Sequence, residues 1–252
     1  MIIHITVIFI ISYLNLSNCG NNDIKYLYRI ENQKLKLDYK SLKSRHRKER
    51  ENYHINLNLR VHRALSWLDK AENTTQDHDA KYIFLWIAFN AAYASEYDAN
   101  SELSEQTVFD RFFTKICELD KSGLLYQLVW EEFTGSIRLL LNNKFIFKPF
   151  WEFCRGVISD KDWQLRFDES KKLANKALAQ KNTTFILKLI FARLYTLRNQ
   201  MLHGGATWNS QTNRDQVRDG AAILTKLVPA IICIMMDNSD TLWGDPCYLV
   251  IE

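Results

Sequence analysis

An arginine, an asparagine and a histidine come together at the end of an apolar stretch of the sequence. They are Arg198, Asn199 and His203, within LYTLRNQMLHGG at residues 194–205. A neutral imidazole can take the proton of a ribose 2′-hydroxyl or return one to a leaving oxygen. A guanidinium can hold a phosphate through two hydrogen bonds, and an amide can orient either group. The three residues therefore suit transesterification of RNA without a metal, because only RNA carries the internal nucleophile.

The spacing of these residues determines how they meet on a helix. Asn199 and His203 are four residues apart and share a helix face. Arg198 is five residues from His203, which places it about 140° away around the helix. Either the long arginine stem or a distorted last turn is needed to bring the guanidinium to the other two groups.

A plainer interpretation of the motif is open beside the catalytic one. Cations near the C-terminus of a helix complement its dipole, so Arg198 and His203 could be present for that reason alone. An Arg-x4-His spacing also arises easily by chance. The neighbouring Asn199 and the following Gly204-Gly205 make the pattern more specific.

Other polar residues are weaker candidates for a site. Arg214 and Arg218 open the helix expected after the motif, where they either extend an RNA-binding surface or form surface charge pairs. Asn90, inside an apolar helix, is expected to be a satisfied hydrogen-bonding residue of the core, with contact to a ligand as the alternative. The sequence predicts no metal site and no cofactor, because its histidines and cysteines lack the spacing of metal ligands. The histidines concerned are His46, His54, His62 and His78.

Helical periodicity covers nearly all of the chain from residue 55 onward. Residues 82–93 are apolar almost all round, which is typical of a central helix buried by its neighbours. An interruption or bend is expected near Gly135 and a kink at Pro229. With 8 Gly, 3 Pro and no strand-like alternation of useful length, the expected class is an all-α bundle with long buried central helices. The expected helices cover 57–72, 78–96, a segment after Ser104, 124–142, 145–154, 162–180, 183–203 and 213–236. Asp77 or Asp79 is expected to cap the second of these, and Thr183 and Thr184 the one over 183–203. The Lys-rich helix over 162–180 is expected to be peripheral.

The composition is that of a globular chain with one basic segment. The 252 residues are 47% hydrophobic and 25% charged, which fits one large domain and excludes wholesale disorder. The net charge is +4, and residues 34–50 hold eight Lys and Arg against two acidic residues. This segment is interpreted as solvated or, alternatively, as an arm that contacts RNA or lipid. The five cysteines are expected to be reduced and mostly buried in a cytoplasmic protein.

The first 16 residues are strongly apolar. Their run is about 15 residues long, short of the roughly 20 that a membrane-spanning helix needs. No Lys or Arg precedes it, as a secretory signal would require. Three interpretations stay open: a mis-assigned translation start or disordered extension, association with a membrane, and export. The expected division is an N-terminal extension over 1–39 and one helical domain over 40–252.

The motif and its context resemble a known superfamily. Arg198-Asn199-x-x-x-His203 is similar to the Arg-polar-x-x-x-His motif of HEPN domains, and the aromatic-rich stretch 84–93 (FLWIAFNAAY) agrees with it. Residues 40–252 most resemble the bacterial Apea-like HEPN proteins. The resemblance implies a HEPN-like helical bundle and a metal-independent endoribonuclease whose site is composed across a homodimer. It is compatible with a toxin or antiphage effector under an antitoxin or regulatory partner. Many members only bind RNA or a partner protein, so a non-catalytic binding module is the alternative.

Overall fold

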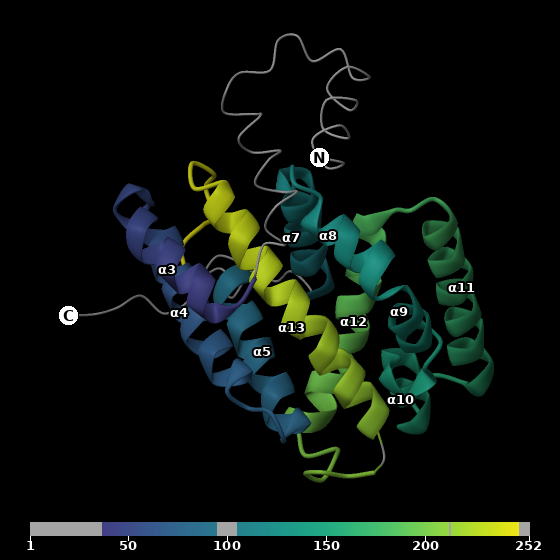
Figure 1. The fold of residues 1–252 in the computed structure, drawn as a ribbon. Coiled ribbons are helices and arrows are strands. Elements are labelled where there is room, and N and C mark those ends of the chain that lie inside the picture. The colour runs from purple at the N-terminus through teal and green to yellow at the C-terminus, as the bar shows by residue number, and fades with distance from the viewer. Residues whose placement is uncertain (1–36, 95–104, 212, 247–252) are drawn as a thin grey trace, which may run out of the picture. The chain divides into compact units, whose positions relative to one another are not determined.

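The computed structural model describes residues 37–94, 105–211 and 213–246 (Figure 1). The compact unit begins at Leu37, slightly before the boundary expected at residue 40. All regular elements among these residues are helices, so the expected all-α class is confirmed. The α-helices are α3 (Tyr39–Glu49), α4 (Ile55–Glu72), α5 (His78–Tyr93), α7 (Glu105–Leu119), α8 (Leu124–Gln127), α9 (Thr134–Leu141), α10 (Lys148–Cys154), α11 (Asp160–Ala179), α12 (Thr183–Leu202) and α13 (Arg214–Asp237). Three short segments join them, η1 (Arg50–Asn52), η2 (Leu128–Glu132) and η3 (Lys144–Ile146).

Side-chain caps set the starts of the long helices. Asp77 accepts a hydrogen bond from the backbone N–H of Ala80 and begins α5, as the sequence suggested for Asp77 or Asp79. Asn182 begins α12 through the backbone N–H of Phe185. The side chain before Thr183 therefore provides the cap that the sequence assigned to the two threonines.

Helix α13 is the centre of the bundle. It runs between α5 and α12 and also packs against α3, α4 and α7 (Figure 1). The helix continues through Pro229, which is itself buried. Among the described helices α13 alone is long and apolar enough to cross a membrane, yet 78% of its apolar window is buried inside the fold. That burial is the property of the core helix of a bundle.

Aromatic rings fill the space between α5, α7 and α12. The Phe191 ring lies 4.4 Å from both the Phe89 and the Phe113 ring, measured between centroids. Trp86 packs edge-on against Phe109 and tilted against Phe191. These contacts fix α12 against α5 in the half of the helix that precedes the motif.

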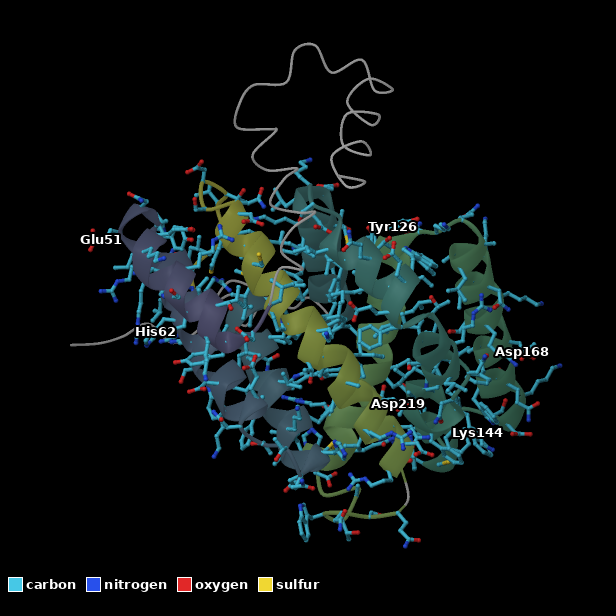
Figure 2. All side chains as sticks on the ribbon, in the orientation of Figure 1. Glu51, His62, Tyr126, Lys144, Asp168 and Asp219 are labelled. Carbon is cyan, nitrogen blue, oxygen red and sulfur yellow. The ribbon has the colours of Figure 1, made fainter. Side chains whose placement is uncertain are left out.

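Two predicted helices, over 162–180 and 124–142, have different outcomes in the structure. Helix α11 is peripheral, as expected: it buries only Ala174 and Ala177, and Asp168 points outward (Figure 2). The stretch expected as one helix over 124–142 is divided instead. The π-helical segment η2 and the non-helical Phe133 separate α8 from α9, and Gly135 lies inside α9. The expected bend is therefore present before Gly135, where the hydrogen-bonding pattern changes.

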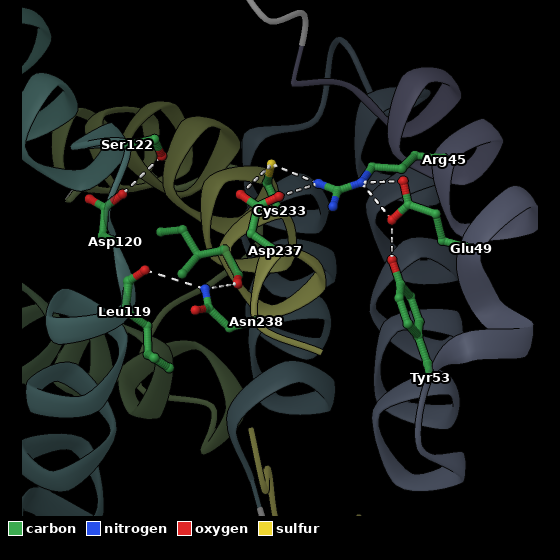
Figure 3. A network of polar contacts seen from close by, with 10 residues as sticks. Arg45, Glu49, Tyr53, Leu119, Asp120, Ser122, Cys233, Asp237 and Asn238 are labelled. Atoms are coloured by element: carbon green, nitrogen blue, oxygen red, sulfur yellow. Dashed lines mark hydrogen bonds and ion pairs between the residues drawn. The ribbon is translucent and has the colours of Figure 1, made fainter. Parts of the chain in front are cut away.

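The basic segment is a packed helix and not simply a solvated stretch. Within α3, Leu42 and His46 are buried at four-residue spacing. Arg45 forms an ion pair with Asp237 of α13 at 2.7 Å (Figure 3). Glu49 completes this contact by accepting hydrogen bonds from Arg45 and from the Tyr53 hydroxyl. This helix was not predicted from the sequence, because its two buried residues lie in a segment that holds eight Lys and Arg.

Candidate functional site

The C-terminal half of α12 carries the predicted trio. Leu194 and Leu197 anchor this half in the core, and the helix ends at Leu202. The backbone N–H of His203 still donates to the carbonyl of Asn199 at 3.0 Å, so the helical pattern persists to the histidine. Gly204 follows with φ +71°, a conformation that favours glycine and stops the helix. The last turn is therefore not distorted, and any approach of Arg198 must come from its side chain.

The stem of Arg198 brings its guanidinium to Asn199. Its Nη1 donates a 2.8 Å hydrogen bond to Oδ1 of Asn199, and its guanidinium lies 5.7 Å from the centre of the Tyr195 ring. Tyr195, Asn199 and His203 follow one another at four-residue steps and form one stripe along α12. The guanidinium thus leans onto the stripe that ends at the histidine. This is the first of the two routes that the sequence left open.

The charge of Arg198 is uncompensated within the described part of the chain. No carboxylate there forms an ion pair with it, and its Nε is buried without a hydrogen-bond acceptor. The Tyr82 hydroxyl donates to the carbonyl of Leu194 at 2.6 Å and interacts electrostatically with this charge. Burial raises the pKa of Tyr82, and the positive charge of Arg198 acts against that rise. A half-buried guanidinium with unused donors is suited to an anion such as a phosphate.

His203 is exposed at the end of the same helix. Among the described residues its imidazole makes no hydrogen bond or ion pair, so both ring nitrogens are open to an incoming group. Leu202, which precedes it, and Trp208 of the following loop are also exposed, to 50% and 74%. The structure therefore brings Arg198 and Asn199 into contact and leaves His203 free on the continuation of their stripe.

No protein-family model, curated protein or solved structure matches the chain. The HEPN resemblance accordingly stays a prediction that depends on the motif and its helical context.

The two arginines proposed to extend the RNA surface both have carboxylate partners. Arg214 pairs with Asp79 of α5 at 2.7 Å and donates to Oδ1 of Asn209 at 2.9 Å. Arg218 pairs with its helix neighbours Asp215 and Asp219. Both arginines therefore form charge pairs, which is the alternative to an RNA-binding surface that the sequence left open. Both guanidinium groups are paired with carboxylates, whereas in the described part of the chain that of Arg198 is not.

The loop after the motif is held by acidic residues that the sequence suggested only as helix caps. Asp77 accepts a 3.0 Å hydrogen bond from the indole N–H of Trp208. Asp79 accepts from the backbone N–H of Asn209 as well as from Arg214. Hydrogen bonds from the backbone N–H of Ala80 and from the Trp208 indole keep the pKa of Asp77 low. Burial of the carboxylate acts in the opposite direction. No sequence signal could reveal these contacts, because they join residues about 130 positions apart.

Asn90 departs from its expected role. Its Oδ1 is buried and has no hydrogen-bond partner among the described residues, so the core amide is not fully satisfied. Within the same residues no three His, Cys, Asp or Glu side chains are grouped as metal ligands. Cys117 and Cys233 are free thiols inside helices, and Cys154 is exposed. Cys19 and Cys247 lie outside the described residues, as does the apolar run over residues 1–16.

Proposed function

We propose that the protein is a metal-independent endoribonuclease of the HEPN type. The observation that carries the proposal is the guanidinium of Arg198, which is uncompensated within the described residues and hydrogen-bonded to Asn199 at a helix end where His203 is exposed. Arg198 would hold the scissile phosphate, and Asn199 would keep the guanidinium in place. A role as a toxin or antiphage effector under a regulatory partner is compatible with this chemistry.

The reaction needs two proton transfers. His203 takes the proton of the 2′-hydroxyl while the 2′-oxygen bonds to phosphorus. The bond between phosphorus and the 5′-oxygen then breaks, and that oxygen takes a proton from an acid. The products are a 2′,3′-cyclic phosphate and a 5′-hydroxyl end. Arg198 stabilises the charge that grows on the phosphate oxygens during the exchange.

A second copy of the chain would supply the missing acid. No other histidine lies close to His203 in the sequence, so the motif itself contributes one such group per subunit. A twofold axis at the end of α12 would bring the partner's histidine to the same cleft, because a C2 interface repeats one patch on both subunits. The exposed side chains of Leu202 and Trp208 give this end of the helix apolar surface to bury.

The test is cleavage of a labelled single-stranded RNA in the presence of EDTA. The wild-type protein is expected to leave 2′,3′-cyclic phosphate ends, and His203→Ala to remove cleavage without changing the helical circular dichroism. His54→Asn is the matched control: this exposed histidine caps α4, and asparagine retains a capping acceptor. Equal cleavage by the His203→Ala protein would refute the assignment. RNA binding without cleavage by the wild type would favour the non-catalytic module.

Mixed assemblies test the shared site. Wild-type subunits combined with inactive His203→Ala subunits should lose activity in proportion to the mixed dimers formed. A protein that is monomeric by light scattering at micromolar concentration and still fully active would contradict the dimeric site.

A further inference from the structure

Helix α3 has an inner and an outer side with different chemistry. On the inner side Leu42 and His46 are buried, and Arg45 is neutralised by Asp237 and Glu49 (Figure 3). The outer side carries cations at three- and four-residue steps along the helix. We call it the basic face of α3; it consists of Lys40, Lys43, Ser44, Arg47 and Lys48.

The basic face of α3 is hollowed and uncompensated. Its five residues, together with Tyr39, line one shallow depression. In the described part of the chain none of its four cations forms an ion pair with a carboxylate, in contrast to Arg45 on the other side. The four cations therefore present their charge outward along about two turns of helix, or roughly 10 Å.

Neighbouring basic groups add to this field. Nζ of Lys43 lies 3.3 Å from Nδ1 of His62 on α4, which Figure 2 places beside α3. Burial lowers the pKa of Lys43, and the charges of Arg47 and Arg50 lower it further. Burial also lowers the pKa of His62, with Lys43 and Arg50 acting in the same direction. Burial and the neighbouring positive charges thus both disfavour the charged forms of Lys43 and His62, and an anion bound there would offset the repulsion between the charges.

We propose that the basic face of α3 binds the phosphate backbone of single-stranded RNA. A row of cations along two helical turns matches a chain of phosphates better than one isolated phosphate. The one large apolar side chain between these cations, Leu42, is buried in the protein and cannot enter a bilayer, which favours a polyanion in water over a membrane. The choice of RNA as the polyanion rests on the proposed function. The surface would hold the substrate strand, while the end of α12 cleaves it.

The experiment measures binding of a labelled 20-nucleotide poly(U) RNA by fluorescence anisotropy in a His203→Ala background, so that the probe stays intact. The test variant replaces Lys40, Arg47 and Lys48 by Gln and leaves the Lys43–His62 contact in place. The control variant replaces three exposed lysines of α11, Lys161, Lys172 and Lys176, by Gln, and removes the same charge.

The test variant is expected to bind RNA on the order of tenfold more weakly at physiological salt. The slope of log K against log salt should become shallower by about 2, from about 0.7 for each lost phosphate contact. The control variant should bind nearly as the parent does. Equal affinity and equal slope in the test and control variants would overturn the proposal. So would a face that retains phosphatidylserine vesicles but not RNA.

A second readout separates this proposal from the assignment of the active site. A dinucleotide offers a single phosphate, so its cleavage should not depend on the basic face of α3. With His203 intact, the α3 variant is expected to cleave a dinucleotide at the wild-type rate and a long RNA with a raised KM. Loss of dinucleotide cleavage in the α3 variant would contradict the binding role. Absence of cleavage by the wild type would contradict the proposed function and leave the anisotropy result to decide the RNA surface.

Discussion

Gly220 of α13 lies so close to Tyr82 of α5 that a Cβ atom added to it would stand 2.9 Å from the tyrosine ring. The same atom would stand 3.0 Å from the Leu194 side chain on α12. The Tyr82 hydroxyl in turn donates to the carbonyl of Leu194, one helical turn before Arg198. Three helices therefore meet at a glycine. These contacts fix the position of α12 along its own axis relative to α5 and α13.

Gly220→Ala should destabilise the protein. The added methyl group must displace a buried ring and a buried leucine, and overpacking of this kind costs about 1–3 kcal/mol in the free energy of unfolding. Gly135→Ala is the control, because this glycine lies in α9 and nothing is within 4 Å of its added Cβ. The control should be neutral or slightly stabilising, by up to about 1 kcal/mol. Urea denaturation of both variants measures the difference, and equal stabilities would show that the contact at Gly220 relaxes freely.

Asn199→Asp should harm RNA cleavage more than Asn199→Ala. Alanine removes the acceptor that orients Arg198, whereas aspartate places a carboxylate at 199 that pairs with the guanidinium and competes with phosphate. Loss of a single group that stabilises the transition state typically lowers kcat by about 10²–10³-fold. We expect the alanine variant to lose a factor in kcat within or below that range, and the aspartate variant to lose a larger factor. The kcat for cleavage of a defined RNA is the measurement, and an aspartate variant as active as wild type would remove Arg198 from the phosphate site.

Asp79→Asn should loosen the loop that follows the motif. The substitution keeps the shape of the side chain but removes the charge that binds Arg214, whose Nε already lacks an acceptor. The expected loss of stability is about 1 kcal/mol. Hydrogen exchange of the amides in residues 206–211 should become faster. Asp215→Asn removes an exposed pair with Arg218 and should cost less than about 0.5 kcal/mol and leave that exchange unchanged.

The stability of the protein should fall as the pH drops below about 6.5, in part because of His46. This buried histidine bonds Asn58 through Nε2, and its Nδ1 is buried without a partner. Burial lowers the pKa of His46, with the positive charge of Lys43 adding to the effect. The unfolded chain therefore takes up a proton near the ordinary pKa of 6.5, while the folded chain resists it. The contribution of His46 is complete above that pH and is lost below it.

His46→Gln tests this origin. Glutamine can still donate to Asn58 but does not titrate, so the variant should lose less stability than wild type between pH 7.5 and pH 5.5. Its stability at pH 7.5 is expected to be the lower of the two. His62, whose pKa is also lowered, should leave some dependence on pH in the variant. The same loss of stability in both proteins would assign the acid sensitivity to other groups.

Deletion of residues 1–36 should leave the helical domain intact. Deletion of residues 1–39 removes Asp38, which caps α3, and the bond from the Tyr39 backbone to Glu72, at a cost of about 1 kcal/mol. Deletion through residue 54 also removes the burial of Leu42 and the Arg45 pair, and should cost at least about 2 kcal/mol. Melting temperatures of the three shortened chains give the order. A chain without α3 that melts with the full protein would show that α3 does not belong to the domain.

Periodicity and caps predicted the long helices well. For α12 the expected span of 183–203 compares with Thr183–Leu202, because the two threonines and the Gly204-Gly205 stop predicted its ends, although the cap itself is Asn182. The helix α3 escaped prediction because two buried side chains at four-residue spacing give a weak apolar signal among many cations. The break at Phe133 was placed near Gly135 because a glycine is the visible signal, whereas a change to π-helical bonding has none.

The site was predictable in residue type but not in geometry. The trio of α12 could be found from its chemistry and its place before two glycines. The turn of Arg198 toward Asn199 depends on the neighbouring Tyr195 ring, and side-chain direction of this kind is set by packing. The pair of Asp79 with Arg214 depends on helices that meet only in the folded chain.

The central position of α13 has a consequence for folding during synthesis. This helix is the last of the described helices to be synthesised, yet the buried faces of α4, α5 and α12 pack against it. Until it emerges, the parts of those faces that contact α13 lack that partner, and the nascent chain exposes them to water. The loop between α12 and α13 also lacks its anchor, because Arg214 belongs to α13. A ribosome-bound fragment that ends before α13 therefore carries the sequence of the motif without the packing that shapes it.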